Sequence, residues 1–272
     1  MNKGKRGSTF LFPESLMQFM MLWKQYLDYR GLEGMARSLK KMHIIPEYGD
    51  YTTIWHRIHD PKPDLDISGM QYAEIRTDGT GMKTNNVGSY RIMKYGDPDA
   101  GKRKHLVVII TADVRTKKII GVQSHIECTG PSEPETASRH IREAVMKGVT
   151  VKGFHGDGAF DVNDLFTLLH ITGTDPIIKI RKNASTGRCR GSKYRRKAVR
   201  EYRKKGYKRW TEDNDYGMRW PGTEGIFSAL KRKFGENCVS RFPEGLEAEG
   251  YQRFWVYDHI NQWAKRMVRE VG

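Results

Sequence analysis

Three acidic residues, Asp78, Asp157 and Glu224, lie far apart in the chain but in settings that suit metal-assisted chemistry. Each aspartate follows a short run of β-forming residues, and the glutamate opens a basic, amphipathic helix. The protein carries a net charge of +16, and bare carboxylates would repel the polyanion that such a charge attracts. Carboxylate oxygens are ligands that Mg²⁺ and Mn²⁺ prefer. We therefore expect two such ions, which could activate an attacking oxygen and stabilise a leaving oxygen in phosphoryl transfer.

Each carboxylate alone also has a simpler explanation. Asp78 and Asp157 are each followed by glycine and could start turns, and Asp161 could cap a helix. Glu224 could be an ordinary first-turn acid. Its helix favours the chemical interpretation, because Glu224 and Lys231 are seven residues apart and share one face. The adjoining apolar stripe, which would pack on the sheet, consists of Phe227, Leu230 and Phe234.

Composition favours an anionic partner. The chain has 272 residues, a mass of 31.5 kDa and a pI near 9.7, and nucleic acid is the simplest partner for such a charge. A merely basic soluble protein and a protein of anionic lipid surfaces are the alternatives. No run of about 18 apolar residues predicts a membrane span, and the basic N-terminus lacks the core of a signal peptide. Three scattered cysteines without a Cys-x-x-Cys pair argue against a zinc ribbon and suit a reducing compartment, so we expect a cytoplasmic, nucleoid-associated protein.

One interval holds nearly all of the net charge. Residues 179–209 contain 15 lysines and arginines and one acid, Glu201. Such a run is usually a solvated, partly disordered loop. Here Tyr202, Tyr207 and Trp210 interleave it, and aromatic rings can stack on unpaired bases while cations neutralise phosphates. We expect this basic insertion, at 181–215, to bind DNA, with phosphate contacts from Arg195, Arg196 and Lys197.

The N-terminal region reads as helical. Apolar spacing predicts helices over 13–29, 32–42 and 51–59, which together could form a groove-reading unit that exposes Thr52, Thr53 and Arg57. A plain helical bundle that covers the core is the alternative. A proline-containing linker follows, so we divide the chain into an N-terminal DNA-binding region (1–60), a linker (61–71) and a catalytic domain (72–272).

The remaining pattern predicts an α/β fold. Strands are expected at 72–77, 105–114, 118–127, 151–155 and 176–180, with an extra one at 91–95. Helices are expected at 133–147, 162–170, from 221 onward and at 251–269. This order indicates a mixed sheet flanked by helices, with the carboxylates at strand ends.

At these motifs the chain resembles the DDE transposases of bacterial and archaeal insertion sequences, over about four fifths of its length. Thr77-Asp78-Gly79-Thr80 looks like the first-aspartate motif of that family, and Gly156-Asp157-Gly158-Ala159-Phe160-Asp161 is similar to the second. Asp50-Tyr-Thr-Thr-Ile-Trp-His-Arg-Ile resembles its N-terminal helical unit. One branch carries Tyr-(2)-Arg-(3)-Glu-(6)-Lys. Here the corresponding residues are separated by two, four and six positions, and they are Tyr216, Arg219, Glu224 and Lys231.

The resemblance implies an RNase H-like catalytic core in which Asp78, Asp157 and Glu224 bind two Mg²⁺ (or Mn²⁺) ions. Cleavage and strand transfer of insertion-sequence DNA would follow, with a homodimer on double-stranded DNA as the working unit. Lys231 and Arg219 would hold phosphates, and Tyr216 would stack on a displaced base. The alternatives are a non-catalytic nucleic-acid-binding protein, an inactive transposase relic, and an RNase H-like nuclease without strand transfer.

Overall fold

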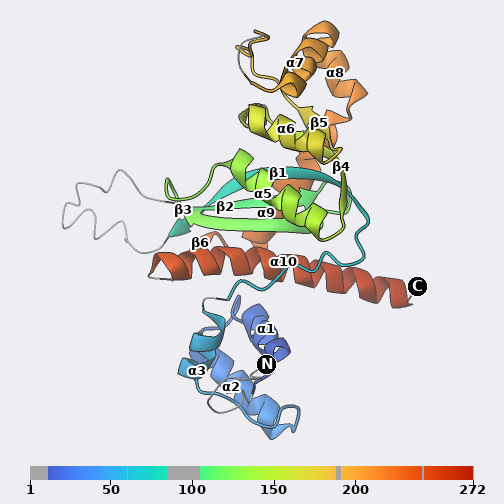
Figure 1. Ribbon diagram of the computed structural model, residues 1–272. Helices are drawn as coiled ribbons and strands as arrows, with labels where there is room; N and C mark the ends of the chain where they lie inside the picture. The colour runs from blue at the N-terminus through green and yellow to red at the C-terminus, as the bar shows by residue number, and fades with distance from the viewer. Residues whose placement is uncertain (1–11, 60, 85–104, 188–190, 241, 272) are drawn as a thin grey trace, which may run out of the picture.

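A computed structural model describes residues 12–59, 61–84, 105–187, 191–240 and 242–271, without the side chains of 218–221, 266 and 268–271. At its centre is a mixed sheet with the strand order β3-β2-β1-β4-β5, and a short β6 pairs with the far end of β1 (Figure 1). The strands are β1 (Tyr72–Thr84), β2 (Leu106–Asp113), β3 (Ile119–Ile126), β4 (Thr150–Gly156), β5 (Asp175–Ile178) and β6 (Asn237–Cys238).

The sheet combines an antiparallel half with a parallel half. β1, β2 and β3 pair antiparallel, whereas β1, β4 and β5 pair parallel. β2 reads as an almost continuous apolar run because both faces of the sheet are covered. This order of strands confirms the predicted α/β fold with an RNase H-like mixed sheet flanked by helices.

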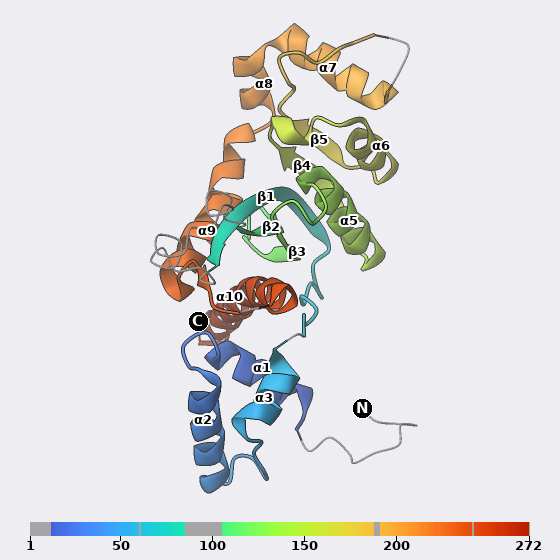
Figure 2. The ribbon, with the colours of Figure 1, turned by 90° about the vertical axis from the view of Figure 1, so that its left-hand side faces the viewer.

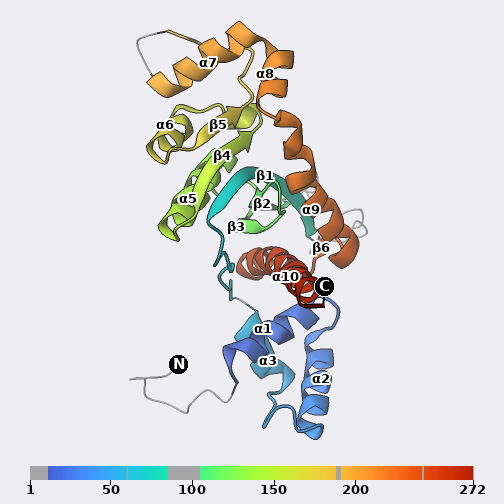
Figure 3. The same cartoon turned by 90° about the vertical axis from the view of Figure 1, so that its right-hand side faces the viewer.

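Helices cover the two faces from opposite sides. α5 (Glu133–Met146) packs on one face, where the His140 ring lies so close to Gly121 that an added Cβ would approach it to 2.3 Å. α10 (Pro243–Val271) runs along the other face, where a Cβ at Gly250 would lie 2.6 Å from Leu106 (Figures 1 and 3). Each helix therefore depends on a glycine that allows it to approach the sheet. Within the described part of the chain, no helix has the apolar length that a membrane span requires.

Three helices form a separate layer beyond α10. α1 (Glu14–Trp23), α2 (Tyr29–Lys41) and α3 (Tyr51–Ile58) pack on one another in the lower part of Figure 1. The predicted helix over 13–29 is interrupted, because Asp28 accepts a hydrogen bond from the Gly31 amide and caps a new helix. Asp50 caps α3 in the same way, through the Thr53 amide.

The linker lies against α10. The Tyr251 hydroxyl donates to the Pro63 carbonyl at 2.7 Å, and the Trp255 indole donates to the Asp64 carbonyl at 3.1 Å. The Gln252 amide reaches back to the Ile58 carbonyl at 2.8 Å. These bonds hold the linker to the covering helix of the sheet.

The basic insertion is folded in its described part. It contains α7 (Lys193–Lys205) and α8 (Tyr207–Asp213), joined at Gly206, whose φ of 75° favours glycine. Val199 and Trp210 are buried within it. These residues therefore do not form the solvated, partly disordered loop that is usual for such a basic run, since a small apolar core orders them. The two helices lie beyond β5, at the top of Figure 2, and the predicted strand at 91–95 lies outside the described residues.

Two further helices complete the part of the fold that follows the linker. α6 (Asn163–Ile171) follows β4, and α9 (Arg219–Phe234) crosses from the basic insertion to β1 and β2 (Figure 3). Leu230 is fully buried and Phe227 nearly so, which confirms the predicted apolar stripe on α9.

Candidate active site

Asp78 and Asp157 lie side by side in the register of two neighbouring strands. Parallel pairing between β1 and β4 ends at Arg76 and His155, and each aspartate lies two residues beyond that pair. Since side chains alternate along a strand, both aspartates continue the face to which Arg76 and His155 belong. Neighbouring strands are roughly 4.8 Å apart, so the two carboxylates are brought together.

The predicted end of β1 at Asp78 needs correction. β1 continues to Thr84, because β2 pairs with it from Ile75 to Met82, and the glycines after Asp78 are part of the strand. The strand that ends beside Asp78 is β4, the parallel neighbour of β1. Asp78 therefore lies within a long strand, at the point where its parallel neighbour turns away.

Three protein groups hold the Asp78 carboxylate. Arg76 donates to Oδ2 at 2.5 Å, the Thr223 hydroxyl donates to the same oxygen at 3.0 Å, and the Gly79 amide donates to Oδ1 at 3.0 Å. Arg76 is only 7% exposed, so its charge lies close to the carboxylate with little intervening water. The geometry fixes the orientation of Asp78 before any ligand arrives.

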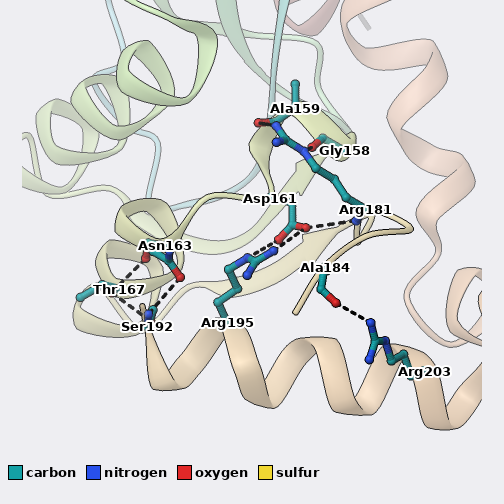
Figure 4. A network of polar contacts seen from close by, with 10 residues as sticks. All are labelled: Gly158, Ala159, Asp161, Asn163, Thr167, Arg181, Ala184, Ser192, Arg195 and Arg203. Atoms are coloured by element: carbon teal, nitrogen blue, oxygen red, sulfur yellow. Dashed lines mark hydrogen bonds and ion pairs between the residues drawn. The ribbon is translucent and has the colours of Figure 1, made fainter. Parts of the chain in front are cut away.

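Asp157 is exposed at the start of the turn η1 (Gly158–Phe160). Its Oδ1 accepts from the Ala159 amide at 2.7 Å, while among the described residues its Oδ2 makes no hydrogen bond or ion pair. Two neighbours support the turn from outside. The Tyr216 hydroxyl donates to the Gly156 carbonyl at 3.0 Å, and Arg181 donates to the carbonyls of Gly158 and Ala159 (Figure 4).

Tyr216 therefore lies in a different environment from the one expected. It is 2% exposed and packs against Trp210, with ring centroids 4.9 Å apart. A ring enclosed in this way is not available for stacking on a base. In this structure its role is to support the strand that leads to Asp157.

Asp161 is engaged elsewhere. Arg195 donates to its two carboxylate oxygens at 2.6 and 3.0 Å, and the Arg181 amide donates to it at 3.1 Å (Figure 4). The Asp161 side chain has no exposed surface and that of Arg195 is 15% exposed. This ion pair ties α7 to the Asp157 turn and occupies one of the arginines expected to contact phosphate.

Glu224 and Lys231 are carried by α9 to the same region. Glu224 is exposed and directly follows Thr223, which is fully buried against Asp78. Lys231 donates to the Gly81 carbonyl of β1 at 3.0 Å, three residues beyond Asp78. Arg219 opens α9, but its side chain lies outside the described part of the chain.

A further carboxylate approaches β1 from the face that α5 covers. Glu133, in the first turn of α5, lies over Gly79, where an added Cβ would be 2.5 Å from its Oε1. Burial raises the pKa of Glu133, and the charges of Asp78 and Asp157 raise it further. Sequence reasoning missed this residue, because an acid in a first helical turn has an ordinary explanation in the helix dipole.

The other residues expected to contact DNA are dispersed. Arg196 donates to the Gly191 carbonyl, and Lys197 is exposed on α7. On α3, the Thr52 hydroxyl donates to Asp50, and Thr53 binds that cap through its amide. Arg57 donates to a backbone carbonyl of residue 12.

The donor set suits a hard divalent cation, although no metal-sized cluster is formed. Among the described residues, no three His, Cys, Asp or Glu side chains are close enough together to hold an ion. However, Asp78 and Asp157 lie close together where the pairing of β1 and β4 ends, and the negative charge of each repels Glu133 and raises its pKa. A cation would relieve this repulsion, so the residues fit the expected metal.

Comparison with known proteins gives structural likeness only. No protein-family model matches the sequence, and curated proteins give no match. The chain is similar to the catalytic core domain of BIV integrase (12% identity, TM-score 0.30, covering 68% of this chain and 82% of that one). It is also similar to piggyBac transposase in a synaptic complex with hairpin DNA (10%, 0.39, 97% and 70%) and to the Mos1 strand transfer complex (8%, 0.28, 96% and 81%). The fold assignment rests on the strand order β3-β2-β1-β4-β5.

Proposed function

We propose that this protein is a DDE-type DNA transposase, which cleaves insertion-sequence DNA and joins it to a target. One observation carries the proposal. Asp78 on β1 and Asp157, which directly follows β4, each lie two residues beyond the last printed pair of these parallel strands, and α9 is bonded to Asp78 through the residue that precedes Glu224. Acidic side chains that are held close together repel one another, and such an unfavourable arrangement is typical of a functional site.

The metal is part of this proposal. Asp78, Asp157 and Glu224 would hold two Mg²⁺ or Mn²⁺ ions. Bound there, such ions would stabilise the charge on a departing 3′-oxygen and lower the pKa of an attacking water or 3′-hydroxyl. If Arg76 released Asp78 Oδ2, that oxygen could bind a metal ion.

The protein's own groups would position DNA around this edge. The ammonium of Lys231 contacts the Gly81 carbonyl, which lies three residues beyond Asp78 on β1. There it can exchange this carbonyl for a phosphate oxygen. The exposed cations of α7 and α8 would neutralise phosphates further along the strand. Double-stranded DNA, as element ends and as target, would be the partner of a homodimer.

A joining assay tests the proposal. A labelled duplex ending in a free 3′-hydroxyl is incubated with supercoiled plasmid, protein and Mn²⁺. We expect label to become covalently attached to plasmid with the wild-type protein and not with Asp157→Asn. Nicking without attached label would indicate a nuclease, and neither product, with DNA binding intact, would indicate a non-catalytic binding protein.

A further inference from the structure

Arg76 is a buried cation among the acids of the candidate active site. It precedes Asp78 by two residues on β1, so the two side chains lie on the same face of the sheet. Its guanidinium donates to Asp78 Oδ2 at 2.5 Å, and its side chain is only 9% exposed. The charge of Arg76 also reaches Glu133, where it opposes the rise in pKa that burial and the charges of the two aspartates cause. Arg76 thus offsets part of the negative charge that the carboxylates bring together.

The oxygen that Arg76 contacts is one that a metal ion would need. Asp78 Oδ2 accepts from both Arg76 and Thr223, and a carboxylate oxygen has two lone pairs, so this oxygen has none left for a cation. Oδ1 accepts from the Gly79 amide. A divalent ion that bound through Oδ1 would still lie close to the guanidinium, where like charges repel strongly because little water separates them. Arg76 and a metal ion therefore compete for Asp78.

Arg76 needs another anion if it is to release Asp78. A buried charge that loses a carboxylate partner is strongly destabilised, and the nearby acids are poor replacements. Glu74 already binds a histidine of β4 and an arginine that follows β2 through its two oxygens. Burial raises the pKa of Glu133, which favours its neutral form, and Asp157 would itself be a ligand of the proposed metal site. The replacement must therefore come from outside the protein.

A DNA phosphate has the chemistry that this exchange requires. The guanidinium of arginine is a planar fork of donors that matches phosphate as well as carboxylate. The side chain of Asp78 is 26% exposed, so a ligand can reach the ion pair although most of Arg76 is buried. The net charge of +16 attracts polyanions, and Lys231 lies on the Gly81 carbonyl, three residues beyond Asp78 on the same strand. A phosphate near Asp78 would thus meet two cations.

We propose that Arg76 occupies Asp78 in the metal-free protein and releases it when the guanidinium binds a phosphate of the DNA substrate. DNA then raises the affinity of the site for a metal ion, and the metal ion raises the affinity for DNA by the same factor. This inference rests on the proposed function for the metal site and for DNA as the substrate. It gives Arg76 a role that the three carboxylates do not have, because Arg76 couples metal binding to the arrival of DNA.

The first test measures Mn²⁺ affinity without DNA by electron paramagnetic resonance, which detects the free ion. Arg76→Gln should bind Mn²⁺ more tightly than the wild type, by about 5- to 150-fold, the usual size of a coupling between two sites. Arg76→Lys keeps the positive charge and should bind Mn²⁺ about as weakly as the wild type. A residue that merely orients Asp78 predicts the opposite sign, because its loss would weaken Mn²⁺ binding. Equal or weaker binding by Arg76→Gln would overturn the proposal.

Arg115→Gln is the matched control, because Arg115 also pairs with a carboxylate of β1, that of Glu74, at 2.9 Å. Its carboxylate partner is not part of the proposed metal site, so this variant should bind Mn²⁺ as the wild type does. An equal gain in Arg115→Gln and Arg76→Gln would overturn the proposal, since any loss of positive charge would then have the same effect.

Asp78→Asn separates this inference from the proposed function. We expect this variant to lose Mn²⁺ binding. If it does so while Arg76→Gln gains no affinity, the inference fails and the proposed metal site stands. If Asp78→Asn binds Mn²⁺ as tightly as the wild type, Asp78 is not a metal ligand, and both proposals fail.

A second series of titrations contains a saturating duplex oligonucleotide, and the Mn²⁺ that the duplex binds by itself is subtracted. Gel electrophoresis of the recovered duplex identifies the samples in which it stayed intact. DNA should raise the Mn²⁺ affinity of the wild type at least about 5-fold and that of Arg76→Gln by a smaller factor, because the competing guanidinium is absent. No rise in the wild type, which can be measured even if Arg76→Gln does not fold, or equal rises in both proteins would overturn the proposal.

Discussion

The Thr223 hydroxyl donates to Asp78 Oδ2 at 3.0 Å and joins two residues that are 145 positions apart in the chain. Thr223 has no exposed surface, so this bond forms away from competing water. Because Thr223 precedes Glu224, the bond sets where α9 presents the third carboxylate relative to β1. It is the most direct connection between the strand half and the helix half of the candidate active site.

Loss of this hydroxyl should impair the site more than the fold. Thr223→Val keeps the shape of the side chain but leaves Asp78 without one donor. A hydrogen bond to a charged group contributes about 1.5–3 kcal/mol, so DNA nicking should slow by roughly 10- to 100-fold. Ser228→Ala, exposed on the same helix, is the control and should nick at the wild-type rate. Equal rates for the two variants would show that the bond is unimportant.

Glu133 should strengthen cation binding without acting as a DNA contact. Glu133→Gln removes one negative charge next to Gly79 while keeping the size of the side chain. Mn²⁺ affinity, followed by electron paramagnetic resonance, should fall by about 10-fold, as is common for changes beside a metal site. Affinity for DNA in EDTA should be equal or slightly higher. Glu135→Gln, which alters the helix cap instead, should leave Mn²⁺ affinity unchanged.

The buried His140 predicts a loss of stability in mild acid. Burial lowers the pKa of His140 to about 3, and its Nδ1 lies 2.8 Å from the hydroxyl of Thr111 on β2. The unfolded chain takes up this proton near pH 6.5 and the folded chain only near pH 3. Stability should therefore fall by about 1.4 kcal/mol per pH unit as the pH drops below 6.5.

Urea unfolding between pH 7 and 4.5 measures this slope. His140→Gln should flatten it by roughly one proton, although burial of His125 and His155 also lowers their pKa values and retains part of the acid sensitivity. His105→Gln, at an exposed histidine, should keep the wild-type slope. Parallel curves for the wild type and His140→Gln would contradict this assignment.

Salt dependence should separate the exposed cations of the basic insertion from those that bind the protein. Lys197, Arg200, Lys204 and Lys208 are exposed on α7 and α8. Replacing all four with alanine should flatten the slope of log affinity against log salt by roughly three to four on duplex DNA if all four touch phosphates. The loss should be similar for specific and random sequences, since phosphate contacts carry no direct base information.

The comparison is the triple variant Arg195→Ala, Arg196→Ala, Lys197→Ala. Arg195 and Arg196 already donate to protein oxygens, so only a change of roughly one is expected. An unchanged slope in the quadruple variant would reduce this surface to a solubilising role.

Local patterns predicted most of the sheet and little of what surrounds its carboxylates. The runs that became β2, β3 and α5 were predicted within two residues, because their periodicity is strong and their ends carry clear signals. β1 was predicted too short, since glycines in Asp78-Gly79-Thr80-Gly81 read as a turn, and only pairing with β2 makes them a strand. Nothing local shows that Arg195 binds Asp161 or that Glu133 lies over Gly79, because both contacts join separate elements across the fold.

In the proposed function, Asp78, Asp157 and Glu224 act as one metal-dependent site, and Asp161 does not belong to it. The most direct test measures Mn²⁺-dependent plasmid nicking, beside DNA affinity in EDTA, for Asp78→Asn, Asp157→Asn, Glu224→Gln and Asp161→Asn. We expect the first three variants to lose nicking by at least about 1,000-fold and to bind DNA as tightly as the wild type or more so, because each loses a negative charge. Asp161→Asn should instead lose about 3 kcal/mol of stability with its buried ion pair and still nick in its folded fraction. Near-wild-type nicking by any of these three variants would show that the three carboxylates do not form one metal-dependent site.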